Sequence, residues 1–309
     1  MNHQHPTTLH GGLLLEALAT GADLSGLKSA NLDGCGLSAI PHGILSLPNL
    51  TSLSLYDNQL TEIPGEIAVL RGLRTLNLGQ NRLEVIPDDF SSLDQLEMLD
   101  LGHNRMRSLP ASLGRLGHLA YLYLSNNRLE RLPDALGELA GLCYLNLTDN
   151  RLTELPSWIG RLSKLIELRV YNNSLSSLPT KIVDLANLVE LHAEHNQIEK
   201  LPDAIGLMSS LNRLNLQSNK LCELPETIGG LCNLTDLNLR FNNLVALPAS
   251  FVQLQSLEYL DLRANALTAL PDDLERLTSL RKLDLRWNRL EVYPSYLRVL
   301  ADRGCIVYT

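Results

Sequence analysis

A short segment, residues 191–202 (LHAEHNQIEKLP), carries side chains that commonly bind metal ions. His192, Glu194 and His195 lie within four positions of one another. Imidazole nitrogens and carboxylate oxygens are ligands for zinc, and the same groups act as general acids and bases. The segment therefore raises two hypotheses, a metal site or a polar recognition surface. The elements that position these side chains decide between the two.

The segment belongs to a repeat that runs through most of the chain. The repeat reads L-x-x-L-x-L-x-x-N-x-L-x-x-L-P-x-x-I/L/F-x-x-L-x-x, and twelve copies fit between Leu27 and about residue 302. Prolines recur at the same spacing from Pro41 to Pro294. Position 1 of each repeat is its first leucine, and the segment above lies in repeat 8. The asparagines at position 9 stand 23 residues apart: Asn58, Asn81, Asn104, Asn127, Asn150, Asn173, Asn196, Asn219, Asn242, Asn265 and Asn288.

The first half of the repeat predicts a short strand. Side chains alternate along a strand, so positions 4 and 6 point to one side and positions 3, 5 and 7 to the other. One repeat cannot bury its leucines alone, whereas stacked repeats form a continuous core. We expect the asparagine amides to bind backbone groups in a buried ladder, and the short return segment to form 3₁₀ or one-turn helices.

On these motifs the chain resembles the leucine-rich-repeat family over nearly its whole length. The LPxxIGxLxxL form is similar to the 23-residue class of bacterial proteins and of plant intracellular Ras-group-related proteins. The resemblance implies an α/β fold, a leucine-rich-repeat solenoid shaped as a curved horseshoe. About twelve short parallel strands would line its concave face, and 3₁₀ or helical turns its convex face. It also implies a protein ligand on the concave face.

The ends of the chain predict caps on one continuous domain. Residues 1–26 are expected to form an N-terminal helical cap, with a short helix over residues 13–19. Residues 27–302 are the twelve repeats, and residues 303–309 a C-terminal cap strand. Because open sheet edges need cover, we interpret the capped repeats as a complete chain.

Composition excludes several classes of function. The net charge of −8 disfavours nucleic acid as the main partner, because phosphate binding needs a basic surface. No apolar run approaches the length of a membrane span, and the N-terminus lacks the features of a secretory signal. The five cysteines are odd in number and scattered. We expect a cytoplasmic monomer that contacts no membrane.

Positions 3, 5 and 7 change character in the middle repeats. The early repeats carry small polar residues there, whereas repeats 5 to 8 carry tyrosines, arginines and acidic residues. Tyrosine and arginine are concentrated at binding hot spots. The alternative is that exposed tyrosines only pack sideways on neighbouring strands. We predict a partner-binding surface of Tyr121, Tyr123, Tyr144, Glu167, Arg169, Tyr171, Glu190, His192, Glu194, Arg213, Arg240 and Arg263.

The late repeats add charges in two columns. Arginines occupy position 7 of repeats 10 to 12, and Asp261 and Asp284 occupy position 5. Such columns either neutralise one another or bind an acidic partner. Trp287, at position 8 beside the C-terminal cap, is interpreted as a cover for the end of the core. A further column leaves open whether it binds an anion: Arg82, Arg105, Arg128 and Arg151.

Motifs for catalysis are absent from the sequence. It contains no phosphate-binding glycine loop, nucleophile elbow, HExxH or CxxC. His192 and Glu194 share a face, with Glu190 as a candidate third ligand, but His195 lies where the chain turns and Arg169 opposes a cation. We therefore predict no catalytic residue, no metal and no cofactor.

These observations lead to one prediction and two alternatives. The predicted function is a non-enzymatic protein-binding scaffold in signalling. One alternative is a bacterial effector that is delivered into a host cell and acts on a host protein. The other is a metal-dependent enzyme on the concave face.

Overall fold

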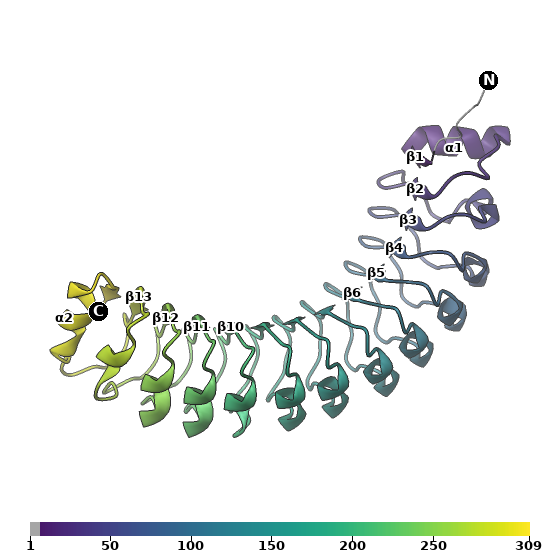
Figure 1. The fold of residues 1–309 in the computed structure, drawn as a ribbon. Coiled ribbons are helices and arrows are strands. Elements are labelled where there is room, and N and C mark those ends of the chain that lie inside the picture. The colour runs from purple at the N-terminus through teal and green to yellow at the C-terminus, as the bar shows by residue number, and fades with distance from the viewer. Residues whose placement is uncertain (1–6) are drawn as a thin grey trace. The chain divides into compact units, whose positions relative to one another are not determined.

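The computed structural model describes residues 7–309, so the first six residues of the predicted N-terminal cap lie outside the described part. The described residues form two compact units. The N-terminal unit ends at Arg151, and the C-terminal unit spans Leu152–Thr309. Each unit is a stack of the predicted repeats, with strands along one side of the ribbon and 3₁₀ turns along the other (Figure 1). The prediction of one continuous domain stays a prediction.

The strands of the N-terminal unit pair in parallel and in sequence order. The register is constant, because each residue faces the residue one repeat further along, as Ser29 faces Ser52. The strands are β1 (Thr8–His10), β2 (Ser29–Asn31), β3 (Ser52–Ser54), β4 (Thr75–Asn77), β5 (Met98–Asp100), β6 (Tyr121–Tyr123) and β7 (Tyr144–Asn146). The 3₁₀ turns are η1 (His42–Ser46), η2 (Gly65–Val69), η3 (Asp88–Ser92), η4 (Ala111–Arg115) and η5 (Asp134–Glu138).

One helix and one extra strand precede the first repeat strand. Helix α1 (Gly11–Thr20) spans the segment predicted to be helical and buries Leu14. It ends at Gly21, whose φ of 68° lies in the left-handed region that favours glycine. Strand β1 pairs with β2 and was not predicted from the sequence. The unit therefore begins with a strand and a helix.

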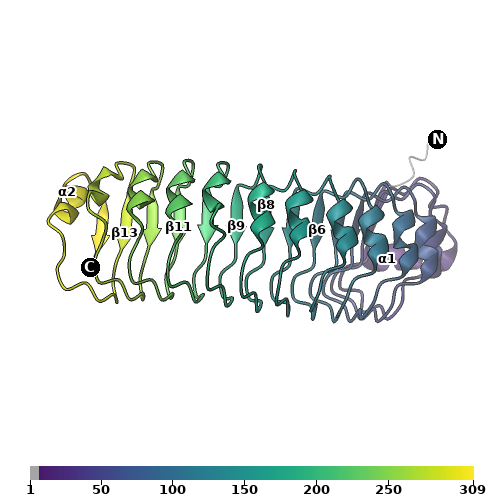
Figure 2. The same cartoon turned by 90° about the horizontal axis from the view of Figure 1, so that it is seen from below.

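The C-terminal unit repeats this pattern, and Figure 2 shows its strands running side by side in one direction. Its strands also pair in parallel and in order. They are β8 (Glu167–Arg169), β9 (Glu190–His192), β10 (Arg213–Asn215), β11 (Asp236–Asn238), β12 (Tyr259–Asp261), β13 (Lys282–Asp284) and β14 (Ile306–Tyr308). The 3₁₀ turns are η6 (Ser157–Arg161), η7 (Thr180–Asp184), η8 (Ile205–Leu207), η9 (Glu226–Gly230), η10 (Ala249–Gln253) and η11 (Leu274–Arg276).

The end of the C-terminal core is covered by helix α2 (Tyr296–Asp302) and strand β14. Leu297 and Leu300 of α2 are buried. Trp287 is 67% exposed, so its interpretation as a cover for the core is wrong. Among residues 7–309, neither helix has the length and apolar character needed to cross a membrane.

Leucines of the repeat form the core, as the alternation predicts. In repeat 4, Leu96, Leu99 and Leu101 at positions 1, 4 and 6 are fully buried. The strand residues at positions 3 and 5 flank the buried position 4 and are more exposed, with Asp284 a buried exception. The predicted division into a core side and an outward side is therefore confirmed for the strands.

The side chain of the asparagine at position 9 joins each repeat to the preceding repeat. The amide of Asn104 donates to the carbonyl of Leu78 in the preceding repeat at 3.0 Å, and to Leu101 in its own repeat at 3.1 Å. The amide oxygen of Asn104 accepts the backbone N–H of Leu83 at 2.9 Å. One buried side chain therefore satisfies backbone groups that would otherwise lack partners.

Position 8, just before this asparagine, adopts a left-handed backbone in every repeat. Such positive φ values favour glycine and, among other residues, asparagine and aspartate. The residues there are Gly34, Asp57, Gln80, His103, Asn126, Asp149, Asn172, His195, Ser218, Phe241, Ala264 and Trp287.

Removal of one asparagine tests the ladder. Asn104→Ala should lower the free energy of unfolding by about 2–4 kcal/mol, because it leaves several buried backbone groups without partners. The measurement is urea denaturation followed by circular dichroism. Arg105→Ala, at the exposed neighbouring position, should change stability by less than about 0.5 kcal/mol. Equal losses in the two variants would contradict the ladder.

Candidate functional site

The outward strand positions hold the side chains that the core does not require. The predicted surface divides between the two units: the three tyrosines Tyr121, Tyr123 and Tyr144 belong to the N-terminal unit, and the other predicted residues to the C-terminal unit.

The tyrosines of the N-terminal unit lie on the adjacent strands β6 and β7. The rings of Tyr123 and Tyr144 have centroids 4.9 Å apart and planes tilted by 38°. Tyr121 is 47% exposed. Two rings therefore pack sideways on each other, as the alternative predicted, whereas Tyr121 is exposed, and a binding role for the three tyrosines stays a prediction.

Charged side chains on β8, β9 and β10 form a connected network in the C-terminal unit. The strand register places Glu167 opposite Glu190, and Glu190 opposite Arg213. The Nε of Arg169 donates to Oε1 of Glu167. Nη1 of Arg213 donates to both carboxylate oxygens of Glu190, at 3.3 and 3.2 Å. Basic and acidic side chains alternate through the network.

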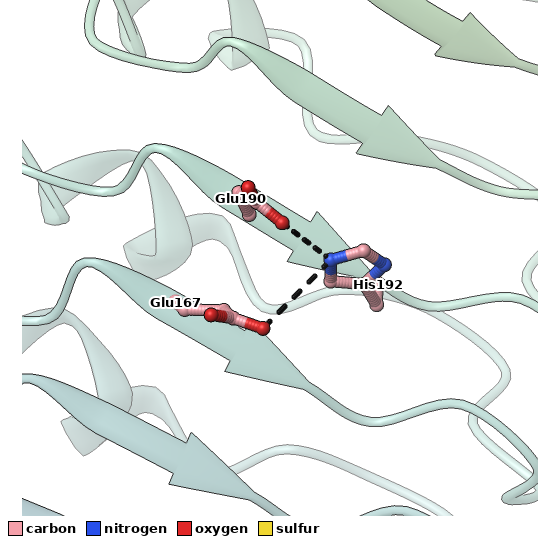
Figure 3. Close-up of side chains that lie close together, drawn as sticks. All are labelled: Glu167, Glu190 and His192. Atoms are coloured by element: carbon pink, nitrogen blue, oxygen red, sulfur yellow. Dashed lines mark hydrogen bonds and ion pairs between the residues drawn. The ribbon is translucent and has the colours of Figure 1, made fainter.

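His192 lies between the two glutamates (Figure 3). Its Nε2 is 2.9 Å from Oε2 of Glu190 on the same strand, and 4.0 Å from Oε1 of Glu167 on β8. The three ligand atoms lie within 4.8 Å of one another. The sequence suggested His192 and Glu194 as the pair, with Glu190 as a third candidate. The structure instead brings His192 together with Glu190 and Glu167.

This group has the donor set of a metal site but also the partners of an ion-pair network. One histidine and two carboxylates fit zinc chemistry. However, Arg169 already binds Glu167, and Arg213 already binds Glu190. A divalent cation would have to displace or oppose these two guanidinium groups. The geometry therefore favours the ion-pair network, and the absence of a bound metal stays a prediction.

The other histidine and glutamate of repeat 8 behave differently. His195 has the left-handed backbone of position 8, and its Nε2 lies 3.3 Å from the side-chain nitrogen of Gln217. Burial raises the pKa of Glu194 more than the nearby charges of His192, His195 and Arg169 lower it. Within the described residues, Oε2 of Glu194 is buried without a hydrogen-bond partner. These two residues are not part of the His192 cluster.

Glu190 titrates in the opposite direction. Burial acts to raise the pKa of Glu190, but the hydrogen bond with His192 and the charges of Arg213, His192 and Arg169 outweigh it and lower the pKa. The carboxylate is therefore ionised at neutral pH. It bridges an imidazole and a guanidinium on one surface.

The late repeats contain the two charged columns that the sequence predicts. Arg263 binds Asp261 of its own repeat, with Nε 2.9 Å from Oδ1. Arg286 binds Asp284 in the same way, with Nε 2.9 Å from Oδ1. Burial acts to raise the pKa of Asp284, but bonds and charges from Arg286 and Arg263 lower it. These aspartates and arginines neutralise one another, which was one of the two predicted readings.

A shallow hollow of about 290 Å³ lies beside these columns on β10 to β13. Its polar lining includes Arg213 and Lys282 together with three aspartates. The sequence analysis did not predict it. The only sequence signal was the run of small Asn or Asp residues at position 5 of repeats 9 to 12, all four of which line the hollow.

Family models of leucine-rich repeats match most of the chain. The model described as "Leucine rich repeat" matches residues 25–83, 48–106, 109–152 and 232–290. The model described as "Leucine-rich repeat region" matches residues 133–219. The chain therefore belongs to the leucine-rich-repeat family, and its fold is a leucine-rich-repeat solenoid, as predicted. The matches do not address the 23-residue class, which stays a prediction.

Solved structures add two receptors to the comparison. The leucine-rich-repeat ectodomain of the membrane receptor kinase GASSHO1/SCHENGEN3 from Arabidopsis thaliana, solved in complex with CASPARIAN STRIP INTEGRITY FACTOR 2, is 30% identical with a TM-score of 0.73. A structure described as a TDR receptor is 33% identical with a TM-score of 0.77. They match 92% and 86% of this chain. The chain spans only 38% and 48% of their lengths.

A bacterial protein shares the fold at lower identity. An internalin from Listeria monocytogenes is 22% identical with a TM-score of 0.73, and the match covers 96% of this chain and 94% of that one. Comparison with curated protein sequences gives no match.

Two glutamates of repeat 8 should respond to pH in opposite directions. The lowered pKa of Glu190 means that its carboxylate stabilises the fold above the ordinary value of 4.5, and that this stabilisation fades as the pH falls. The raised pKa of Glu194 means that its ionisation costs stability as the pH rises. Glu190→Gln should therefore lower the melting temperature at about pH 8, and Glu194→Gln should raise it.

The gain in Glu194→Gln should vanish as the pH falls and Glu194 takes up its proton, whereas the loss in Glu190→Gln should shrink only below the ordinary value of 4.5. The measurement is thermal melting of the three proteins across this pH range. Shifts of the same sign in both variants, or shifts that do not depend on pH, would contradict the assignment.

Proposed function

We propose that the chain is a non-enzymatic scaffold that binds a protein through the outward side of its strands. The observation that carries the proposal is the network of Glu167, Arg169, Glu190, His192 and Arg213. These side chains bind one another on the surface and contribute nothing to the leucine core. A relative with 30% identity was solved in complex with CASPARIAN STRIP INTEGRITY FACTOR 2, which supports a protein ligand.

The network suits recognition because it fixes charges in defined places. Ion pairs across an interface contribute mostly to specificity and to the rate of encounter, since a partner with the wrong charges is rejected. Glu190 is held ionised between His192 and Arg213. We assign to the acidic side chains and His192 the role of discriminating among partners, and to Arg169 the role of binding a carboxylate.

The tyrosines of the N-terminal unit provide a second area of the same kind. Tyr121 is exposed, and Tyr123 and Tyr144 hold each other in place. Rigid aromatic side chains lose little entropy on binding, which makes them effective anchors. We propose that they act as flat anchors, with Tyr171 in that role in the C-terminal unit.

We further propose a cytoplasmic monomer that acts in signalling, without a cofactor. The metal-dependent alternative keeps one supporting observation, the three donors within 4.8 Å. Metal analysis of the purified protein tests it, because a tight site would retain zinc, iron or manganese in about equimolar amount. The effector alternative has no supporting contact in the structure, and a translocation assay tests it.

Exchanging one ion pair tests the binding function. The variant E190R/R213E keeps opposite charges in contact but reverses the pattern that a partner meets. Capture of the partner from lysate should fall about tenfold or more, because charges matched to a partner become repulsive. The melting temperature should fall, as in Glu190→Gln, because the bond to His192 is lost, but the protein should stay folded at the temperature of the capture assay.

The matched control exchanges an exposed pair of the same unit. In K200E/E223K the swapped groups lie 3.1 Å apart in the wild type, outside the strands. This variant should capture the partner as the wild type does. Capture that survives E190R/R213E, or that is lost equally in the control, would remove the proposed surface.

A further inference from the structure

Two aromatic residues of the C-terminal unit occupy a backbone conformation that does not suit them. Phe241 and Trp287 lie at position 8, with φ values of 56° and 61°. A bulky side chain in the left-handed region is an outlier, and the other repeats place glycine, alanine or polar residues there. Their rings are 47% and 67% exposed, so burial does not compensate for the strain. Folding gives no reason for aromatic residues at these positions.

Phe241 and Trp287 occupy the same position as Ala264 in the repeats before and after it. The backbone N–H of Phe241 donates to Arg263 at 2.9 Å, and that of Ala264 donates to Arg286 at 3.0 Å, so the three repeats stay in register here. Phe241 and Trp287 are two repeat steps apart, or about 10 Å. Between them Ala264 contributes only a methyl group. We call the surface made by the two exposed aromatic residues and the partly exposed Ala264 the notch.

Arginines border this notch at position 7. The guanidinium carbon of Arg240 lies 5.8 Å from the Phe241 ring, and that of Arg286 lies 5.8 Å from the Trp287 ring. Both distances are typical of cation–π contacts. Cationic groups therefore line the apolar surface along its length.

Arg240 differs from the two arginines that follow it. Arg263 and Arg286 bind the aspartate two residues before them, whereas the residue two before Arg240 is Asn238. Among the described residues, the Arg240 guanidinium has no hydrogen bond or ion pair with a carboxylate, and its covered Nε lacks an acceptor. Three arginines and two aspartates thus leave one positive charge unmatched, in a chain whose net charge is −8.

We propose that Arg240, Phe241 and Trp287 form a docking strip for an extended protein segment that carries a carboxylate beside an apolar side chain. The carboxylate binds Arg240, and the apolar side chain lies over Ala264 between the two rings. The proposal rests on the proposed function, because it names a partner chemistry for a protein-binding scaffold.

The chemistry favours a single carboxylate over a polyanion. A guanidinium offers paired N–H donors that match the two oxygens of one carboxylate. Asp261 and Asp284 already occupy Arg263 and Arg286, so Arg240 is the one unmatched guanidinium of the three, whereas a polyanion needs a row of them. The aromatic walls favour an apolar neighbour for the carboxylate, as in a mixed acidic and apolar peptide.

Asn238→Asp gives the sharpest test, because it rebuilds in repeat 10 the pair that repeats 11 and 12 already have. The new carboxylate should bind Arg240 and so exclude the carboxylate of a ligand, although the arginine itself is unchanged.

The probe is a phage-displayed library of random decapeptides, selected on the wild-type protein. Selection should enrich peptides with Asp or Glu next to an apolar residue. A synthetic copy of the most enriched peptide should bind about tenfold more weakly to N238D and R240Q, and to F241N with W287N.

Two controls separate binding from folding. Phe241→Asn and Trp287→Asn should not lower the melting temperature, because asparagine suits the backbone of position 8 better. Arg105→Gln, on an exposed arginine of the N-terminal unit, should leave peptide affinity unchanged. A glutamine analogue of the synthetic peptide, with every acidic residue replaced, should bind about tenfold more weakly than the parent.

The proposal is overturned by three results: no enriched peptide, enrichment without acidic residues, or equal affinity for the wild type and N238D. None of these results decides the proposed function. That function is judged by capture of a partner from lysate and by its loss in E190R/R213E. If capture behaves as expected and the peptide experiments fail, only the docking strip falls.

Discussion

The structure depends on a hydrogen-bonded asparagine that repeats every 23 residues. Each such asparagine joins the turn of its own repeat to backbone groups of the preceding repeat, as Asn104 does with Leu78 and Leu83. The turn it stabilises ends the strand at the same place in every repeat. Outward side chains therefore line up in columns, and a surface feature arises wherever one column departs from its neighbours.

Most of the fold could be predicted because one pattern specifies it many times. Alternation and spacing give the strands, the core leucines and the 3₁₀ turns without knowledge of a neighbour. Features that occur once were harder. Strand β1 has only three residues, and pairing with β2 creates it. Trp287 was interpreted as a cover for the end of the core because it lies beside the C-terminal cap, but Leu297 and Leu300 of α2 are buried there and Trp287 stays exposed.

The candidate site could be predicted only as a set of columns. The columns identify the outward residues, but each side chain has candidate partners on its own strand and one repeat away, and its rotamer decides between them. From the sequence, His192 could pair with Glu190 or with Glu194, because each lies two residues away. In the structure it pairs with Glu190 and approaches Glu167. The unmatched charge of Arg240 had a sequence signal, since Asn238 stands where the next two repeats have aspartate. Only the structure shows that those aspartates bind their arginines.

The constant register has a consequence for how such a chain changes in length. Loss or duplication of one whole repeat brings together two repeats with the same hydrogen-bonding pattern. The strand pairing and the asparagine bonds can therefore form across the new junction. Only the outward residues that neighbour one another across the new junction change. Deletion of repeat 10, for example, would bring Arg213 beside Tyr259, which now lie two strands apart. Recombination between repeats can thus rearrange the outward residues one repeat at a time while the leucine core is preserved.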